Sequence, residues 1–266
     1  MTGSERDDAR RVSRRIDTML VRGFRQQAAG GKPLLPQHQR ITMKGANIMP
    51  ELPEVERGRR LAASVAEKRT ITQVRCVEDP IVFEEVTPGA FQHRLTHKQV
   101  IAVHRRGKQL WFELDQPPHP LFHFGMTGAF HPPAAESLPL KSGSKESRGE
   151  WPLRFTKMHL WFDDGGELIM INARRLGRIL LRDTPLHEPS LNKLGFDPLL
   201  DLPSPKTFST MLRSRAAVIK SLLLDQRFVA GVGNWIADEV LYQAGIAPHR
   251  RANSLSDAEA KRLRGK

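Results

Sequence analysis

The 266-residue sequence has a single cysteine, Cys76. One thiol can form neither a disulfide framework nor a cysteine-based zinc site, and it is typical of a chain that works in a reducing compartment. Because Cys76 alternates with Thr72 and Val74 in a strand-like run, we interpret it as a buried apolar side chain.

The sequence also lacks long apolar runs and is short of negative charge. No run approaches the roughly 18 apolar residues of a membrane span, so we expect no membrane partner. Lys and Arg number 42 against 29 Asp and Glu, which gives a net charge of +13 and a pI near 10.4. Such a surplus favours a polyanion as the partner, nucleic acid before membrane.

The first 48 residues carry ten Lys or Arg against four Asp or Glu and show no sustained periodicity. Three interpretations are open. The composition favours disorder, and the arginine bias fits an organelle transit peptide, although Glu5, Asp7 and Asp8 argue against one. The third interpretation, which we favour, is that Met49 is the true initiator.

A helix is expected directly after Met49. Pro53 suits the first helical turn because its φ angle is fixed and it has no N–H to leave unpaired. Glu54 and Glu56 place negative charge at the positive end of the helix. A packing stripe follows at steps of three and four: Val55, Gly58, Ala62 and Val65.

From residue 71 the pattern changes to short apolar runs separated by turn-forming residues, of which 163–166 is the clearest turn. The expected strands are 71–77, 99–104, 108–114, 121–124, 157–162, 167–171 and 178–181. Several short strands without intervening helices indicate an antiparallel β-sandwich. The run 132–150 is rich in Pro, Ser, Lys and Gly and is expected to be a solvated loop.

After residue 189 the pattern becomes helical. Ser204 and Pro205 predict the start of a helix that reaches about residue 214, and 217–225 predicts a second. Asn234 is expected to cap a third helix over 235–244.

Gly245 should end that third helix, and Ser256 with Glu259 forms a capping box for a fourth. The expected fold class is therefore α+β. Residues 1–48 form an extension, 49–185 an antiparallel β-sandwich domain with a flanking helix, and 186–266 an all-α domain.

Four strings combine cations with turn residues. They are His104-Arg105-Arg106-Gly107-Lys108-Gln109-Leu110-Trp111, His123-Phe124-Gly125-Met126-Thr127-Gly128, Asn172-Ala173-Arg174-Arg175-Leu176-Gly177-Arg178, and 219–226 continued by 229–239. Each has a plain structural explanation, such as a strand-end lysine, a glycine turn or a solvated charged turn. Gly231 and Gly233 lead into a helix N-terminus, where backbone N–H groups suit a phosphate.

Together with Met49-Pro50-Glu51-Leu52-Pro53-Glu54, these strings resemble the formamidopyrimidine-DNA glycosylase family over about residues 49–263. The resemblance implies a β-sandwich followed by a helix–two-turn–helix domain, and an enzyme that removes oxidised purines and cleaves the resulting abasic site. It implies no metal and no other cofactor. Leu52 favours the formamidopyrimidine branch over the endonuclease VIII branch, which typically has glycine there.

The resemblance also implies catalytic roles. Pro50, exposed when Met49 is removed, would be the nucleophile, Glu51 the general acid, and Glu54 the residue that orients the amine end. Lys108 would contact the phosphate near the lesion and assist catalysis. An α-amino group has a pKa of about 7.7–8.0 against roughly 10.4 for lysine, so a useful fraction is neutral and nucleophilic.

Further residues of the four strings would bind DNA. Met126 would enter the duplex where the damaged nucleotide leaves, Arg174 would pair with the orphaned cytosine, and Leu176 would lie beside that base. The residues expected to contact the DNA backbone are His123, Arg175, Lys220 and Asn234.

Two departures from the family pattern limit these expectations. Leu176 replaces a phenylalanine and stacks poorly, so opposite-base discrimination is expected to differ. The family's carboxyl-terminal finger has no counterpart, since the sequence ends inside the fourth helix of its domain, and the DNA clamp is expected to be incomplete.

The sequence therefore predicts a base-excision repair glycosylase and lyase that acts as a monomer on damaged double-stranded DNA. The expected location is the nucleus, or a mitochondrion or chloroplast if residues 1–48 are a transit peptide. An alternative is a catalytically silent DNA-binding protein of the same fold, in which Pro50 stays inside an amide bond. A structural RNA-binding protein is a more remote alternative.

Overall fold

The computed structural model describes residues 50–133 and 151–266, and all of them belong to one compact unit. The expectations for residues 1–48 and for 134–150 lie outside the described residues. Within the described part, no helix is both long enough and apolar enough to cross a membrane.

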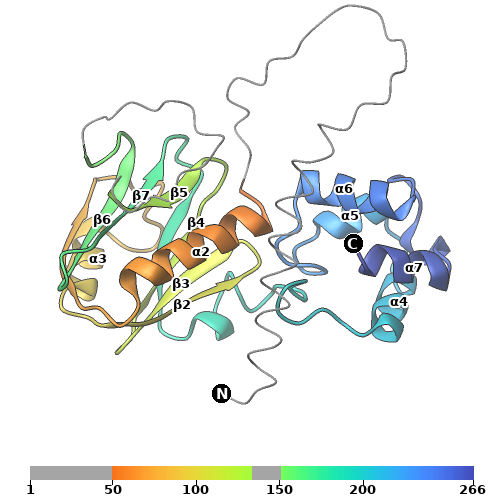
Figure 1. The fold of residues 1–266 in the computed structure, drawn as a ribbon, viewed down its shortest axis with the longest axis horizontal. Coiled ribbons are helices and arrows are strands. Elements are labelled where there is room, and N and C mark those ends of the chain that lie inside the picture. Colours follow the sequence, from red (N-terminus) through yellow and green to blue (C-terminus); the bar gives the residue numbers. More distant parts are fainter. Residues whose placement is uncertain (1–49, 134–150) are drawn as a thin grey trace, which may run out of the picture. The chain divides into compact units, whose positions relative to one another are not determined.

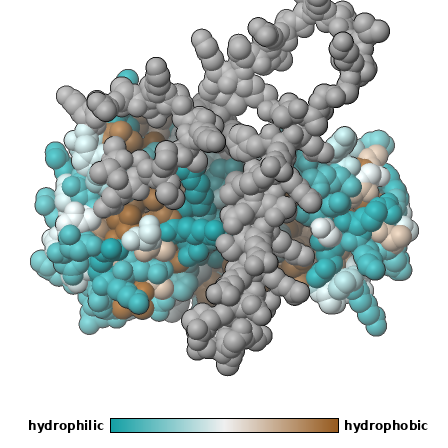
Figure 2. Space-filling view, viewed as in Figure 1, coloured by the Kyte–Doolittle hydropathy of each residue, from teal (hydrophilic) through white to brown (hydrophobic). Residues whose placement is uncertain are grey.

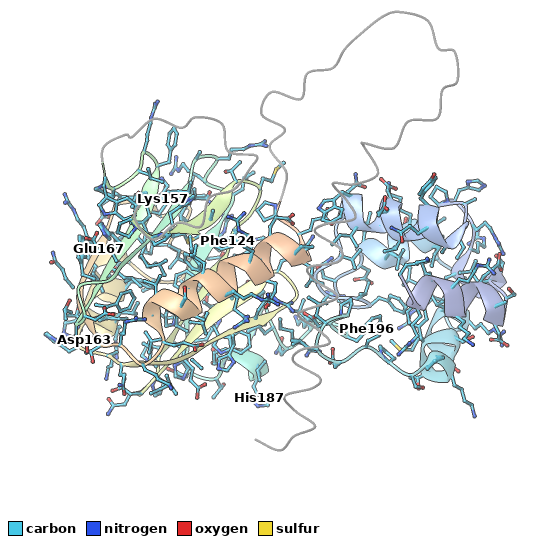
Figure 3. The ribbon with its side chains drawn as sticks, in the orientation of Figure 1. Phe124, Lys157, Asp163, Glu167, His187 and Phe196 are labelled. Atoms are coloured by element: carbon cyan, nitrogen blue, oxygen red, sulfur yellow. The ribbon has the colours of Figure 1, made fainter. Side chains whose placement is uncertain are left out.

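The first described helix, α2, spans Leu52–Ala66, with Glu51 as its N-cap residue and Pro53 in its first turn. The predicted stripe is confirmed, since Val55, Gly58, Ala62 and Val65 are all buried. Figure 1 shows α2 lying along the strands that it packs against, β2 (Val100–Arg106) and β5 (Gly128–His131) among them. A Cβ on Gly58 would come within 2.8 Å of the Phe124 ring, so glycine is what allows this close approach (Figure 3).

Within residues 50–133 and 151–266, eight strands form two four-stranded antiparallel sheets, which confirms the predicted sandwich. One sheet has the order β1-β6-β7-β5 and the other β2-β3-β4-β8. The remaining bounds are β1 Ile71–Cys76, β3 Gln109–Leu114, β4 His119–His123, β6 Thr156–Phe162, β7 Glu167–Asn172 and β8 Arg178–Arg182. The core between the sheets is built on large apolar side chains that include Phe91, Phe112, Phe122, Phe130, Met158 and Met170.

Two elements of the sandwich were not predicted. The expectation of strands without an intervening helix is wrong, because α3 (Pro88–Leu95) lies between β1 and β2. Thr87 caps α3 by accepting a bond from the Ala90 N–H, and Pro88 begins it. The same pair, a capping hydroxyl residue followed by proline, correctly predicted the helix start at Ser204 and Pro205. Strand β5 was missed because its four residues directly follow a glycine turn.

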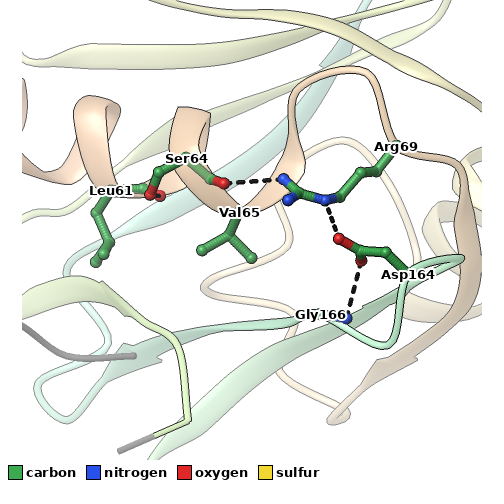
Figure 4. A pocket seen from close by; sticks show the side chains of 6 residues that line it. All are labelled: Leu61, Ser64, Val65, Arg69, Asp164 and Gly166. Atoms are coloured by element: carbon green, nitrogen blue, oxygen red, sulfur yellow. Dashed lines mark hydrogen bonds and ion pairs between the residues drawn. The ribbon is translucent and has the colours of Figure 1, made fainter. Parts of the chain in front are cut away.

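The turn predicted at 163–166 is present between β6 and β7. Gly165 has a φ of 84°, which favours glycine. Asp164 accepts a bond from the Gly166 N–H at 2.9 Å and pairs with Arg69, whose Nη1 donates to the Ser64 carbonyl at 2.8 Å (Figure 4). These contacts tie the turn to the end of α2.

Four α-helices and a core of their own make up the rest of the described chain. They are α4 Pro205–Arg213, α5 Ile219–Leu224, α6 Asn234–Ala244 and α7 Asp257–Arg264, with short 3₁₀ turns at Pro185–His187 and Ala252–Ser254. The predicted cap at Ser204, the left-handed Gly245 and the Ser256–Glu259 capping box are confirmed. On the face drawn in Figure 2, the surface of these helices is largely hydrophilic.

Cys76 ends β1 and is half-buried, packed against the sandwich core. Burial, with a smaller contribution from Glu78, raises the pKa of its thiol to about 12. A thiol with so high a pKa is a poor nucleophile at neutral pH, in keeping with a packing role.

The buried side-chain amide of Asn172 joins the turn that follows β4 to the turn that precedes β8. Asn172, which is fully buried, donates from Nδ2 to the Phe124 carbonyl at 2.9 Å and accepts the Gly177 N–H on Oδ1 at 3.2 Å. Gly125–Gly128 and Arg174–Gly177 are therefore held together by one side chain.

We expect Asn172→Ala to destabilise the fold by about 1–3 kcal/mol, because it leaves the buried Gly177 N–H without its partner. Urea denaturation of the full chain would measure the change. Asn192→Ala is the matched control, since the Asn192 amide makes one exposed bond to the His187 carbonyl and should cost less than about 0.5 kcal/mol. Equal costs for the two variants would contradict this role of Asn172.

Candidate active site

The predicted catalytic residues Pro50 and Glu51 are buried at the start of α2. The Glu51 carboxylate accepts three backbone N–H bonds from the start of α6. These come from Gly233 at 2.9 Å, Trp235 at 3.0 Å and Ile236 at 3.1 Å. An anionic group at this position is stabilised by both the unpaired N–H groups and the helix dipole. The residue next to Pro50 is therefore fixed to a helix about 180 positions later in the chain.

Two glycines make this contact possible. A Cβ on Gly233 would lie 2.3 Å from the Glu51 carboxyl carbon, and one on Gly231 would lie 2.3 Å from Leu52 Cδ1. The Leu52 N–H donates to the Gly231 carbonyl at 3.1 Å. The expectation that the N–H groups of this turn are presented to a phosphate is wrong here, because Glu51 occupies the Gly233 N–H and the Gln226 side chain the Gly231 N–H.

The prediction that Asn234 caps α6 is also wrong. Gly233 is the N-cap residue, Asn234 is the first residue of the helix, and the capping oxygens come from Glu51. Asn234 is exposed. Its predicted contact with a DNA phosphate stays a prediction.

Glu54 lies one turn into α2 and accepts the Glu51 N–H on its carboxylate at 3.0 Å. Burial raises the pKa of Glu54, an effect that its backbone hydrogen bonds partly offset. The environment of Glu54 therefore favours its protonated form, and the Glu51 oxygens serve as hydrogen-bond acceptors. The role of Glu51 as the general acid stays a prediction.

Lys108 directly precedes β3, at the turn that connects β2 and β3. Burial lowers the pKa of its ammonium group, while the charges of Glu51 and Glu54 act in the opposite direction. The structure thus brings Pro50, both glutamates and Lys108 into one region. A half-buried lysine between carboxylates is suited to hold an anion or to move a proton.

His123 ends β4 in the same region. Burial, with smaller contributions from the charges of Lys108 and Arg178, lowers the pKa of its imidazole to about 4. The ring is therefore neutral at pH 7. Nδ1 accepts the Gly125 N–H at 3.3 Å, which leaves Nε2 as the donor that could reach a phosphate oxygen.

Met126 and Leu176 lie on two turns that pack against each other. A Cβ on Gly125, whose φ is 63°, would lie 2.4 Å from the Leu176 carbonyl group, so only glycine fits between the turns. Met126 is half-buried and the Leu176 side chain is exposed. The Arg174 N–H donates to the Thr127 hydroxyl at 3.3 Å. The three residues predicted to enter the duplex thus share one support.

Arg175 is held by Asp79, a residue that the sequence did not single out. The guanidinium donates from Nε and Nη2 to the buried carboxylate at 2.9–3.1 Å, and Lys157 Nζ lies 2.7 Å from the same group (Figure 3 labels Lys157). Although burial opposes ionisation, these two cations hold the pKa of Asp79 at about 2. Asp79 and Arg175 are 96 positions apart, so no local pattern could have paired them.

Lys220, on α5, forms an ion pair with Asp238 of α6 at 2.7 Å. Two of the predicted phosphate ligands, Arg175 and Lys220, are therefore paired with carboxylates in this structure. Their roles in binding DNA stay predictions, and the pairing shows what a phosphate would have to compete with. Among the described residues, no group of three or more His, Cys, Asp or Glu side chains could hold a metal ion.

Comparisons with known proteins identify the family of the chain. The family model for the formamidopyrimidine-DNA glycosylase N-terminal domain matches residues 49–179, and the model for the helix–two-turn–helix domain of the same family matches 194–266. The formamidopyrimidine-DNA glycosylase of Arabidopsis thaliana is 39% identical over 215 residues, which cover 81% of this chain but only 55% of the Arabidopsis protein.

This chain covers a larger share of the length of its bacterial relatives. The protein of the same name from Heliobacterium modesticaldum is 37% identical over 218 residues, covering 81% of this chain and 74% of its own length. The structure of Lactococcus lactis formamidopyrimidine-DNA glycosylase bound to DNA with an abasic site has a TM-score of 0.67 at 28% identity, covering 81% and 77% of the two chains. The Thermus thermophilus MutM (Fpg) structure has a TM-score of 0.64 at 32% identity, covering 81% and 72%.

The two family models follow each other along the chain in the order of the sandwich and the helices, and the relatives cover both parts. On this basis the chain belongs to the formamidopyrimidine-DNA glycosylase family.

Proposed function

We propose that the chain is a base-excision repair enzyme that removes oxidised purines, 8-oxoguanine and formamidopyrimidines, from double-stranded DNA and then cleaves the abasic site. The observation that carries this proposal is the placement of Pro50 and Glu51 against the start of α6, with Glu54 and Lys108 in the same region. Related structures add support, since one is a complex with DNA that contains an abasic site and another a complex with DNA that contains carbocyclic 8-oxoguanine.

The chemistry follows from a free Pro50 amine. The nitrogen attacks C1′ of the damaged nucleotide, the bond from C1′ to the base breaks, and the base leaves with a proton from solvent or a nearby acid, while the amine gives up its own proton to solvent or a nearby base. Opening of the sugar ring gives an iminium between Pro50 and C1′, and a carboxyl group of Glu51 or Glu54 supplies the proton to the ring oxygen. Loss of the C2′ proton then expels the 3′ phosphate, and a second elimination expels the 5′ phosphate.

The alternative function is DNA binding without catalysis. It is favoured by the sequence itself, in which Met49 precedes Pro50 and makes its nitrogen part of an amide. An amide nitrogen has no usable lone pair and cannot form a Schiff base. The choice between the two functions therefore depends on whether the peptide bond before Pro50 is cleaved. A monomeric state and a nuclear location remain part of the proposal.

We expect a chain that begins at Pro50 to be trapped on abasic DNA by borohydride, and the unprocessed 266-residue chain not to be. The amine is free only in the first case, and blocking it with an N-terminal tag should abolish trapping. Denaturing gel electrophoresis with mass spectrometry of the intact proteins would measure the adduct and verify processing.

Trapping of a verified unprocessed chain would rule out Pro50 as the nucleophile and direct attention to Lys108. Pro50→Gly in the processed chain is the matched control, because it keeps an amine at the same position and should retain part of the trapping. If neither chain is trapped while both bind DNA, the binding-only function is supported.

We expect Lys220→Ala and Asp238→Asn to change DNA affinity in opposite directions. Loss of Lys220 removes a phosphate contact, so it should weaken binding of damaged and undamaged duplex alike and lower the salt slope by about 0.9. Asp238→Asn frees Lys220 from its ion pair, worth at most about 1 kcal/mol for so exposed a pair, and should tighten binding up to about fivefold. Fluorescence anisotropy at several salt concentrations would measure the affinity of both variants. Weaker DNA binding by Asp238→Asn would contradict the idea that Asp238 competes with a DNA phosphate for Lys220.

We expect Met126→Ala to slow extrusion of the damaged nucleotide on the order of tenfold while leaving binding to undamaged duplex unchanged. An apolar side chain fills the gap in the base stack, and a loss of about 1.4 kcal/mol in that step corresponds to tenfold. Stopped-flow fluorescence of a base analogue beside the lesion would follow extrusion. Unchanged extrusion kinetics would assign Met126 to the turn alone.

A further inference from the structure

The turn that carries Lys108 is anchored by a buried carboxylate. Asp197 has no exposed surface and accepts the Gly107 N–H on Oδ2 at 2.8 Å. The Gly107 carbonyl accepts a bond from Arg105 Nη1 at 3.1 Å. Both backbone polar groups of Gly107, the residue before Lys108, are thus bound, one by the acid and one by its arginine partner.

Arg105 extends this anchor to α2. Its side chain is 1% exposed, pairs with both oxygens of Asp197 and donates from Nε to Glu56 at 3.1 Å. The positive charges of Arg59, Arg105 and Arg60 hold the pKa of Glu56 at about 2 although burial opposes this. A buried arginine needs such partners because an unpaired buried charge is strongly destabilising. The chain of charges links α2, the β2–β3 turn and the segment before α4.

The same turn is confined on its other side. Gly107 has a φ of 56°, and a Cβ there would lie 3.0 Å from Ala230 Cβ and 3.2 Å from the Gly231 nitrogen. Gly231 is also the residue whose carbonyl binds the Leu52 N–H beside the active site. The lysine turn and the start of α2 therefore rest against one short segment, which fixes the position of one relative to the other.

We propose that Asp197 is a positioning residue for Lys108, acting through the Gly107 N–H and Arg105 to hold the lysine beside Glu51 and Glu54. A lysine side chain has four flexible bonds, so its location is set by where the backbone starts it and by what surrounds it. Misplacement of a reacting group by about 1 Å can cost a hundredfold in rate. The consequence for catalysis rests on the proposed function, whereas the positioning itself does not.

The positioning is tested without DNA on the full 266-residue chain. Lys108 is acetylated with a limiting amount of an amine-reactive reagent across a pH series. Peptide mass spectrometry of the products then reports the titration of its amine. The charged and titratable groups that face it are Glu51, Glu54 and His123. If Asp197→Asn loosens the turn, Lys108 gains solvent, and its titration midpoint should rise toward that of exposed lysines.

Two further variants separate positioning from general stability. Gly107→Ala displaces the turn without leaving a buried charge unpaired, so it should raise the Lys108 midpoint even if Asp197→Asn does not fold. Glu85→Gln is the control, because it removes the carboxylate that pairs with Arg182, itself 8% exposed, at 2.8 Å elsewhere in the sandwich. Glu85→Gln should leave the midpoint unchanged. If Asp197→Asn folds and leaves the Lys108 midpoint unchanged, the proposal is overturned. If Asp197→Asn does not fold, an unchanged midpoint in Gly107→Ala overturns it.

A double-mutant cycle in the Schiff-base-forming chain tests the catalytic consequence. Asp197→Asn should slow borohydride-trapped adduct formation on the order of ten- to a hundredfold, and should have no further effect in a Lys108→Ala background. Additive losses would show that Asp197 acts on the fold rather than through Lys108. If the parent chain forms no adduct, the proposed function fails while the titration still decides the positioning.

Discussion

The interaction on which the rest of the site depends is the one between the Glu51 carboxylate and the first N–H groups of α6. A charged acceptor at a helix N-terminus satisfies donors that would otherwise be buried without partners, and each such bond is stronger than a neutral one. The contact also determines sequence elsewhere, because Gly231 and Gly233 have to lack a Cβ for Glu51 and Leu52 to fit. The position of Pro50 is therefore set jointly by α2 and by the helical part of the chain.

A second constraint is the internal pairing of positive charge. The chain has a large surplus of Lys and Arg, yet Arg105, Arg175 and Lys220 each contact a carboxylate. Buried pairs such as Arg105–Asp197 fix backbone geometry, since breaking them leaves an uncompensated charge. The more exposed Lys220–Asp238 pair costs little to separate. Buried cations therefore shape the site, whereas more exposed cations can exchange their carboxylate partner for a DNA phosphate.

Features with local causes were predictable from the sequence, and features with distant causes were not. The stripe on α2, the capping box at Ser256 and the left-handed Gly245 depend on residues within a few positions, and all were predicted correctly. Asn234 was assigned as a cap because asparagine suits that position, but the cap is Glu51, 183 positions earlier. A capping carboxylate from another segment leaves no local pattern. The miss at α3 differs, because Thr87 and Pro88 were a readable signal.

The way Pro50 is held also bears on how its nitrogen could react. The contacts that fix the start of α2 are the Glu51 carboxylate on α6, the Glu51 N–H on Glu54, and the Leu52 N–H on Gly231. All of them are made by groups on the carboxyl-terminal side of the Pro50 nitrogen. Cleavage of the preceding peptide bond would remove none of them. A nucleophile at a chain end is normally mobile, and an anchor made entirely by the following residues keeps it in place while its lone pair stays free.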